Sequence, residues 1–211
     1  MTSSEAPRAR AIRVTGLAVR RGERTLFDSL DLEVQAGEAL LLRGPNGAGK
    51  TSLLLTLYGA IRPEAGRIEF LGGDPEARAQ THVHLVGHRP AVKARMTVAE
   101  NLGFWAALNG ATGEPVDAAL DQVGLGGLAE ADAGHLSAGQ TRRLALARLL
   151  VTRRDIWLLD EPTAALDAQG EALVARLIDG HCARGGIAVA ATHHDVPLAA
   201  PIRTMTLGTT A

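Results

Sequence analysis

The sequence predicts an α/β fold: a mixed and partly parallel sheet flanked by helices, with an N-terminal antiparallel β part and an inserted helical subdomain. Three observations support this prediction. Short apolar runs fill the chain before residue 87, helical patterns dominate about residues 88–150, and buried strands then alternate with a helix. The last pattern is typical of a parallel sheet covered by helices. We expect residues 1–10 to form a flexible tail and residues 11–211 to form one domain.

Short runs of β-type residues begin the predicted domain. Gly16 and the turn at residues 21–23 interrupt them, and Gly37 turns the chain into the next strand. Two further runs follow before the predicted helical subdomain. The predicted strands of this part are residues 12–14, 17–19, 30–34, 39–42, 68–71 and 83–86.

The predicted helical subdomain opens on a capping box, with Thr97 at the N-cap and Glu100 at position N3. This helix is expected to continue to about Leu108. Ser137 is expected to cap another helix that continues to Leu150. The remaining predicted elements are a helix over residues 115–123, a buried strand over 156–159, a helix over 171–178 and a buried strand over 187–191.

The composition is that of an ordinary globular protein, with 46% hydrophobic and 21% charged residues. The formal net charge is −1 without a block of like charges, so we expect no nucleic-acid partner. Cys182 is the only cysteine, which excludes an internal disulfide and favours a reducing compartment. No stretch approaches the ~18–20 apolar residues that cross a bilayer, so any membrane role is expected to depend on a partner chain.

Residues 44–51 match the phosphate-binding loop G-x-x-x-x-G-K-[ST], between a predicted strand and a predicted helix. Glycines let backbone N–H groups approach phosphates, and the helix dipole favours negative charge there. Lys50 is expected to reach the β- and γ-phosphates, and the Thr51 hydroxyl to ligate Mg²⁺. The sequence therefore predicts a nucleoside triphosphate site. Its predicted binding residues are Gly44, Pro45, Asn46, Gly47, Ala48, Gly49, Lys50, Thr51 and Ser52.

Two carboxylates, Asp160 and Glu161, follow the predicted strand 156–159. The carboxyl ends of parallel strands face the ligand crevice, so both side chains are expected beside the phosphates. Mg²⁺ prefers oxygen ligands and keeps several waters, which suits Asp160 as a residue that holds the ion through water. Glu161 is placed to orient and polarise the attacking water. The alternative interpretation is an acidic strand-to-turn junction on the surface.

Residues 136–140, Leu-Ser-Ala-Gly-Gln, form a helix N-cap. A serine hydroxyl, a glycine N–H and a positive helix end would also hold a γ-phosphate. The loop at residues 44–51 already binds the phosphates of one nucleotide. A second helix end that can bind phosphate therefore makes sense if it binds the nucleotide held by a partner molecule. The predicted binding residues are Ser137, Gly139 and Gln140.

Taken together, these motifs resemble those of the ATP-binding cassette (ABC) ATPases over nearly the whole chain. The resemblance implies a P-loop NTPase core, ATP and Mg²⁺ as ligands, and a homodimer that holds two ATP molecules between one subunit's phosphate-binding loop and the other's signature. The matching segments occur in the family's order: the Walker A loop at 44–51, the signature at 136–140, Walker B at 156–161, the D-loop at 164–167 and the switch residue His193.

The spacing of these motifs agrees with the family, with 20 residues from Gln140 to Asp160 and 33 from Asp160 to His193. The resemblance therefore assigns His193 to the γ-phosphate as a catalytic residue. The alternative is a histidine at a strand end that makes a local hydrogen bond. The neighbouring His194 shows that a histidine at this place need not be catalytic.

Two positions depart from the family's pattern. His88 occupies the loop position at which the family usually has glutamine, and imidazole nitrogen is a poor ligand for Mg²⁺. We interpret His88 as a hydrogen-bonding sensor of the γ-phosphate or of the water around the ion. Arg20 and Arg21 stand where the family tends to have an aromatic residue that stacks on adenine, and a guanidinium plane can also stack on a base.

Several arginines cluster in and after the third predicted helix. Because they are local and the net charge of the chain is −1, we favour a solvated or ion-paired helix face for them over a polyanion-binding site. The arginines of this group are Arg142, Arg143, Arg148, Arg153 and Arg154.

Within the ABC ATPases, residues 87–93 (Gly-His-Arg-Pro-Ala-Val-Lys) and 96–102 resemble the ATPase subunits of the haem exporters of cytochrome c maturation, with Ala91 where a glycine is expected. This resemblance implies a peripheral membrane protein on the cytoplasmic side of a bacterial inner membrane. It also implies integral-membrane permease partners of the CcmB and CcmC type, and ATP hydrolysis coupled to haem delivery for c-type cytochromes.

Three other interpretations remain open at this point. The chain could be the ATPase of another small ABC import or export system. It could be a soluble ABC ATPase that acts on DNA or ribosomes, although such proteins usually have two cassettes or a long coiled-coil insertion, which this sequence lacks. A nucleotide switch without hydrolysis is disfavoured because Glu161 and His193 are both present.

Overall fold

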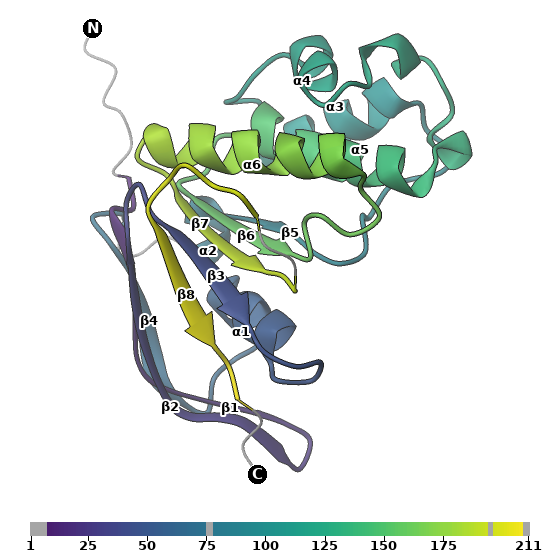
Figure 1. Cartoon of the computed structure of the whole chain (residues 1–211). Helices are drawn as coiled ribbons and strands as arrows, with labels where there is room; N and C mark the ends of the chain where they lie inside the picture. Colours follow the sequence, from purple (N-terminus) through teal and green to yellow (C-terminus); the bar gives the residue numbers. More distant parts are fainter. Residues whose placement is uncertain (1–7, 75–77, 194–195, 209–211) are drawn as a thin grey trace, which may run out of the picture.

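An antiparallel sheet and a parallel sheet lie against each other, and helices cover the remaining face of the parallel sheet (Figure 1). The computed structural model describes residues 8–74, 78–193 and 196–208. In these residues the elements are β1 (Ala11–Arg21), β2 (Arg24–Gln35), β3 (Ala39–Arg43), α1 (Lys50–Leu57), β4 (Ala65–Leu71), α2 (Ala79–His82), β5 (Val83–Val86), α3 (Val98–Asn109), α4 (Val116–Gln122), η1 (Gly126–Leu128), η2 (Ala133–His135), α5 (Ala138–Val151), β6 (Ile156–Asp160), α6 (Ala168–Ala183), β7 (Ile187–Ala191) and β8 (Ile202–Thr206).

The antiparallel sheet has the strand order β2-β1-β4. The predicted runs at 12–14 and 17–19 are one strand, β1, and the predicted break at Gly16 was wrong. Gly16 has a φ of +58° at a register shift, and its N–H donates to Asp31 Oδ1 at 2.6 Å. A glycine takes up such a bulge without ending the strand.

The parallel sheet has the order β5-β6-β7-β3-β8. The predicted α/β class with an antiparallel part and a parallel sheet is therefore confirmed. β8 was not predicted, because this edge strand is mostly exposed and Ile202, Thr204 and Thr206 give only a weak apolar alternation. The carboxyl ends of β3, β5, β6 and β7 all lie at one edge of the sheet, which is where a ligand crevice forms.

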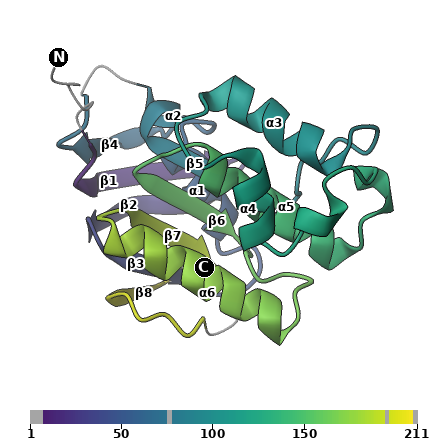
Figure 2. The same ribbon diagram turned by 90° about the horizontal axis from the view of Figure 1, so that it is seen from above.

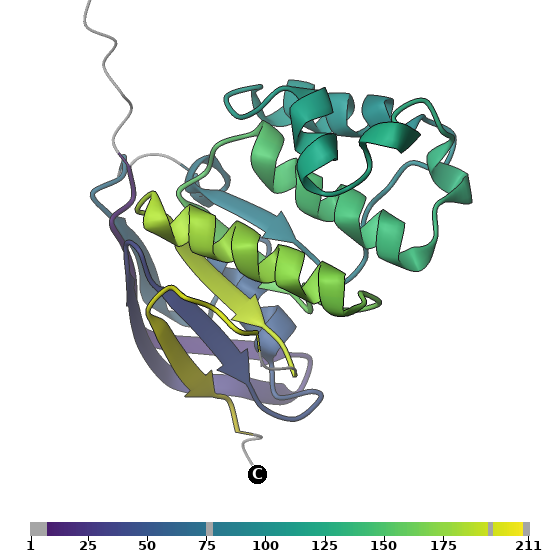
Figure 3. The same cartoon turned by 45° about the horizontal axis from the view of Figure 1, so that its top comes forward.

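Side chains alternate between the two faces of the parallel sheet and so divide the core in two. On β3, Leu40 and Leu42 pack with α1 and with the inner face of the antiparallel sheet, whereas Ala39 and Leu41 pack toward α5 and α6. Helix α1 is thereby enclosed between the two sheets, and Leu53 is fully buried there. In Figure 3, α6 runs along the opposite face of the parallel sheet.

Helices α3, α4 and α5 pack against one another beside the parallel sheet, within the range predicted to be helical (Figure 2). The capping box of α3 is formed: Glu100 N–H donates to Thr97 Oγ1 at 3.1 Å, and Thr97 N–H donates to Glu100 Oε2 at 2.8 Å. Ser137 and Gln140 make the same reciprocal pair at the start of α5. Within the described residues, no helix combines the length and apolar character that crossing a membrane requires.

Residues 1–7 of the predicted tail lie outside the described residues. The rest of that segment is held in place. Ala9 is 2% exposed and its N–H donates to Asp155 Oδ2 at 2.9 Å, while Arg10 N–H donates to Leu71 O at 2.6 Å. These bonds attach the chain to both sheets before β1 begins.

Three histidines are buried at the amino ends of β5 and β6, the edge opposite the crevice. His181 stacks on Trp157 with ring centroids 3.9 Å apart, and its Nε2 lies 3.1 Å from Asp155 O. His82 Nδ1 lies 3.5 Å from Asp155 Oδ2, and His84 is paired in register with Trp157. Burial lowers the pKa of His181 to about 4 and that of His84 to about 3.

The lowered pKa values of His181 and His84 predict that the fold loses stability in mild acid. An unfolded histidine binds a proton below about pH 6.5, whereas folded His181 does so only near pH 4. The unfolded state therefore binds more protons between these values, and stability falls as the pH falls. For His181 alone the expected loss at pH 5 is about 2 kcal/mol relative to pH 7.5. Urea unfolding at both pH values measures it.

His181→Phe keeps a ring against Trp157 but cannot titrate, so its unfolding free energy should depend less steeply on pH. His135, which is exposed, provides the control: His135→Gln should keep the steep dependence of the native chain. An identical pH slope in the native chain and in His181→Phe would contradict the prediction.

Candidate functional site: a nucleotide pocket

The phosphate-binding loop links β3 to α1 and takes a conformation that its glycines permit. Gly44, Gly47 and Gly49 have φ values of +133°, +80° and +97°. At Gly49 a Cβ atom would lie 2.7 Å from Phe27 Cζ, so any side chain there would collide with the β2 ring that supports the loop. Glycine is therefore required for both the turn and its packing.

Lys50 begins α1 and points back across the loop. Its Nζ donates to Gly44 O at 2.7 Å and to Pro45 O at 3.2 Å, and it lies 3.1 Å from His193 Nε2. The side chain is only 7% exposed. The loop thus fixes a positive charge where backbone N–H groups and a helix N-terminus already favour an anion.

Thr51 and Asp160 meet across the sheet edge. Thr51 Oγ1 donates to Asp160 Oδ2 at 3.0 Å and lies 3.2 Å from Oδ1. Asp160 closes β6 and is buried, with 4% of its surface exposed. A hydroxyl and a carboxylate in contact form an oxygen donor set that fits Mg²⁺.

Glu161 follows Asp160 in a left-handed backbone conformation, with a φ of +48°. Its Oε1 lies 3.4 Å from His193 Nε2, the atom that also contacts Lys50. The lysine ammonium can only donate and the carboxylate can only accept, so one imidazole nitrogen can bond only one of them at a time. His193 Nε2 therefore has two alternative partners, and the tautomer of the imidazole decides which of them it bonds.

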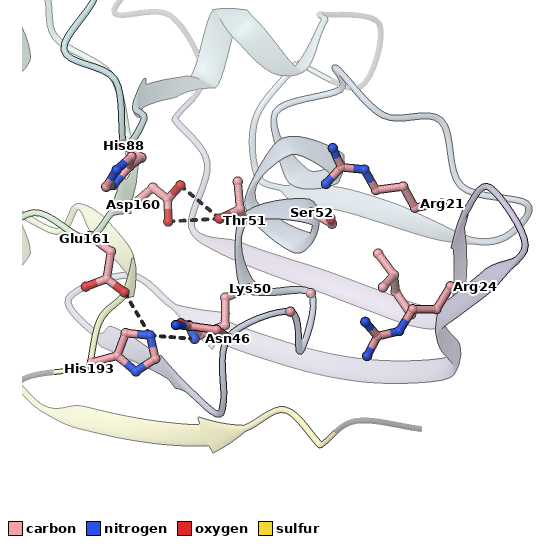
Figure 4. A pocket seen from close by; sticks show the side chains of 13 residues that line it. Arg21, Arg24, Asn46, Lys50, Thr51, Ser52, His88, Asp160, Glu161 and His193 are labelled. Atoms are coloured by element: carbon pink, nitrogen blue, oxygen red, sulfur yellow. Dashed lines mark hydrogen bonds and ion pairs between the residues drawn. The ribbon is translucent and has the colours of Figure 1, made fainter. Parts of the chain in front are cut away.

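These side chains line one cavity of about 480 Å³ (Figure 4). His88, Asp160, Glu161 and His193 approach from one side of the loop, whereas Arg21 and Arg24 lie on the other. Arg21, given as an alternative to an adenine-stacking aromatic residue, is thus at the pocket, and Arg20 instead faces Glu64 across 4.0 Å. The lining residues are Arg21, Arg24, Leu26, Asn46, Gly47, Gly49, Lys50, Thr51, Ser52, His88, Asp160, Glu161 and His193.

The loop residues Gly44, Pro45 and Ala48 do not line this cavity. Ala48 is buried beneath the loop and Gly44 is packed against Leu207 O, which a Cβ atom would approach to 2.2 Å. They shape the loop rather than face the cavity. Arg24 and Leu26 were not predicted, since nothing in the sequence around them indicates that β2 passes the nucleotide pocket. His194, the neighbour of His193, lies outside the described residues.

Ser137, Gly139 and Gln140 line a second hollow of about 390 Å³, on the same chain but separate from the first. Its remaining lining comes from residues 124–125, Arg143 and the segment 165–167. Arg143 Nη2 lies 3.3 Å from Asp167 Oδ1 and so connects the signature helix to the D-loop segment. One chain therefore presents two separate polar pockets, with the phosphate-binding loop and the signature each in its own.

The interpretation of the arginine cluster as a solvated or ion-paired face was wrong for Arg142 and Arg148. They are 3% and 7% exposed. The Arg148 guanidinium lies 3.7 Å over the Trp105 ring and donates to Pro90 O at 3.0 Å. Arg143 does form the ion pair that was expected. A signal for burial was present in the sequence, because Arg148 interrupts an otherwise apolar run from residue 144 to residue 151.

Residues 27–164 match the family model described as ABC transporter, which covers more than half of the chain. The chain belongs to the ABC transporter family. This family assignment confirms the prediction made from the motifs, and it identifies the chain as an ATP-binding ABC ATPase.

Named relatives agree with the assignment. The chain is 52% identical over 198 residues to the cytochrome c biogenesis ATP-binding export protein CcmA of Rhodopseudomonas palustris strain HaA2, covering 93% of this chain and 97% of that protein. It is 48% identical over 190 residues to CcmA of Rhizobium johnstonii, covering 86% and 87%. A solved ABC transporter ATP-binding protein from Pyrococcus furiosus has the same fold, with a TM-score of 0.81 at 24% identity over 93% of this chain and 97% of that one.

Proposed function

We propose that the chain is the ATP-hydrolysing subunit of the transporter that exports haem for c-type cytochrome biogenesis. The observation that carries this proposal is the convergence of Lys50, Thr51, Asp160, Glu161 and His193 on one cavity. Relatives named as cytochrome c biogenesis ATP-binding export proteins support the assignment to export for cytochrome c biogenesis. The choice of haem rests on the resemblance of residues 87–102 described above.

The residues of the cavity divide the chemical work between them. Lys50 and the loop N–H groups hold the β- and γ-phosphates, while Ser52 and Asn46 complete the wall of the pocket. Thr51 and Asp160 would hold Mg²⁺, which supplies charge neutralisation at the phosphate oxygens. Glu161 accepts a proton from the attacking water. His193, between Lys50 and Glu161, donates to the γ-phosphate when its imidazole carries the required proton.

A second copy of the chain completes each site in this proposal. Ser137, Gly139 and Gln140 occupy a pocket of their own, so they can serve the nucleotide held by a partner's loop. The start of α5 is suited to binding an anion, because the Ser137 hydroxyl lies at the N-terminus of the helix, where the positive end of the helix dipole is. The expected assembly is a homodimer with two ATP molecules, docked on permease subunits of the CcmB and CcmC type at the cytoplasmic face of the bacterial inner membrane.

The membrane role can be tested by co-expression with and without the permease subunits, followed by fractionation. With the permease, the chain should sediment with membranes and be recovered with the permease in a pull-down. Without it, the chain should move to the supernatant, while a resident inner-membrane protein stays in the pellet as the control. An equal distribution in both strains would remove the transporter assignment and favour a soluble ABC ATPase.

A further inference from the structure

Arg142 makes a set of contacts that the roles described so far do not use. It lies in the first turns of α5 and is 3% exposed. Its Nη2 donates to Asp160 O and to Glu161 O, both at 2.6 Å. Its Nε donates to Pro162 O at 3.2 Å and its Nη1 to Gly87 O at 2.8 Å. One guanidinium thereby connects the signature helix, the turn after β6 and the loop after β5.

The turn that Arg142 holds is the one that orients Glu161. This residue has a φ of +48°, a conformation that disfavours residues with a side chain. Its N–H donates to Ala191 O at 2.8 Å, and its carbonyl accepts from Ala164 N–H at 3.0 Å as well as from Arg142. Such a conformation persists where surrounding bonds over-determine it. Arg142 supplies the bonds that come from a different element.

We propose that Arg142 is a positioning residue for ATP hydrolysis, whose guanidinium fork holds the Glu161 turn so that its carboxylate faces the pocket. This inference rests on the proposed role of Glu161 as the base. Arg142 does not itself line the pocket, and it contacts Asp160 and Glu161 only at their backbone carbonyls, so it acts through the backbone of residues 160–162.

The geometry requires arginine specifically. Arg142 donates four hydrogen bonds, one from Nε, one from Nη1 and two from Nη2, and all four acceptors are backbone carbonyls. Arginine offers five donors in a rigid plane, lysine offers three on a flexible stem, and glutamine offers two. Arg148 differs, since its guanidinium is placed by the Trp105 ring and a single carbonyl. The two buried arginines of α5 therefore form a matched pair in which only one reaches the Glu161 turn.

The same fork joins Glu161 to the loop of His88. Gly87 directly precedes His88, and its carbonyl oxygen accepts a hydrogen bond from the Arg142 guanidinium that also holds Glu161. A movement of this loop therefore changes the bonds available to the Glu161 turn. This provides a physical connection between the His88 loop and the catalytic carboxylate, through a residue on the signature helix.

The test compares Arg142→Gln, Arg142→Lys and Arg148→Gln in purified full-length protein. Both Arg142 variants should lower kcat for ATP about 10–100-fold, the scale expected when a catalytic group is slightly misplaced. KM and the dissociation constant for ATP should stay near the native values, because the phosphate-binding loop is untouched. Arg148→Gln should lower the melting temperature while keeping native kcat. A native kcat in Arg142→Lys, or equal losses of kcat in Arg142→Gln and Arg148→Gln, would overturn the proposal.

A double-mutant cycle separates this inference from the proposed function. If Arg142 acts through Glu161, adding Arg142→Gln to Glu161→Gln should lower kcat no further. A further full loss in the double variant would overturn the positioning role. Near-native turnover in Glu161→Gln alone would instead refute the proposed base, whatever Arg142 does.

Discussion

Lys50→Ala is expected to abolish ATP hydrolysis and to weaken ATP binding about 100-fold or more. The variant removes the charge that the loop holds between Gly44 O, Pro45 O and His193. A hydrogen bond to a charged group contributes about 1.5–3 kcal/mol, and Lys50 is expected to make such bonds to two phosphates. Titration with a fluorescent ATP analogue measures the loss, with circular dichroism to show that the fold is kept.

The chain contains a natural control for this experiment. Lys93 is the only other lysine, and its Nζ lies 4.5 Å over the Phe104 ring, outside the cavity. Lys93→Ala should bind ATP with native affinity. Native affinity in Lys50→Ala as well would remove the assignment of residues 44–51 to the phosphates.

Glu161→Gln is expected to bind ATP but to hydrolyse it about 10²–10⁴-fold more slowly, the usual contribution of a general base. Glutamine has nearly the same shape and can keep the turn held by Arg142 and Ala191, so nucleotide binding should survive. Because ATP then stays in place, the two copies should remain associated. Multi-angle light scattering with ATP should report a dimer, and phosphate release should be lost.

Glu171→Gln serves as the matched control, because Glu171 lies in the first turn of α6 and does not line the cavity. It should hydrolyse ATP at the native rate. If Glu161→Gln also did so, a different group would be the base. If it bound ATP firmly yet stayed monomeric, the shared-site arrangement with Ser137 would be refuted.

The parts of the fold and pocket that could be predicted are those determined by residues close together in the sequence. The loop at 44–51, the capping box at Thr97, the N-cap at Ser137, and the buried strands predicted over 156–159 and 187–191 each depend on a few adjacent residues. Parallel pairing then brings the ends of these strands to one edge, so separate motifs could be combined into one site.

The features that were missed depend on contacts between distant segments. β8 forms because it pairs with the free edge of β3. Its own exposed residues show little alternation of apolar and polar side chains. Arg142 is buried because carbonyls from residues 87 and 160–162 surround it, and no pattern near Arg142 encodes those acceptors. Arg24 reaches the cavity through the placement of the antiparallel sheet. Propensity and spacing describe neighbours in sequence, whereas these positions are set by packing.

The position of β3 has a consequence for biosynthesis. This strand carries the phosphate-binding loop, yet its hydrogen-bonded neighbours are β7 and β8, about 150 residues further along the chain. A ribosome therefore releases the loop long before the strands that will flank it. Until residues 187–206 have emerged from the exit tunnel, the nascent chain lacks the scaffold for nucleotide, and added ATP should not protect such a stalled chain from protease.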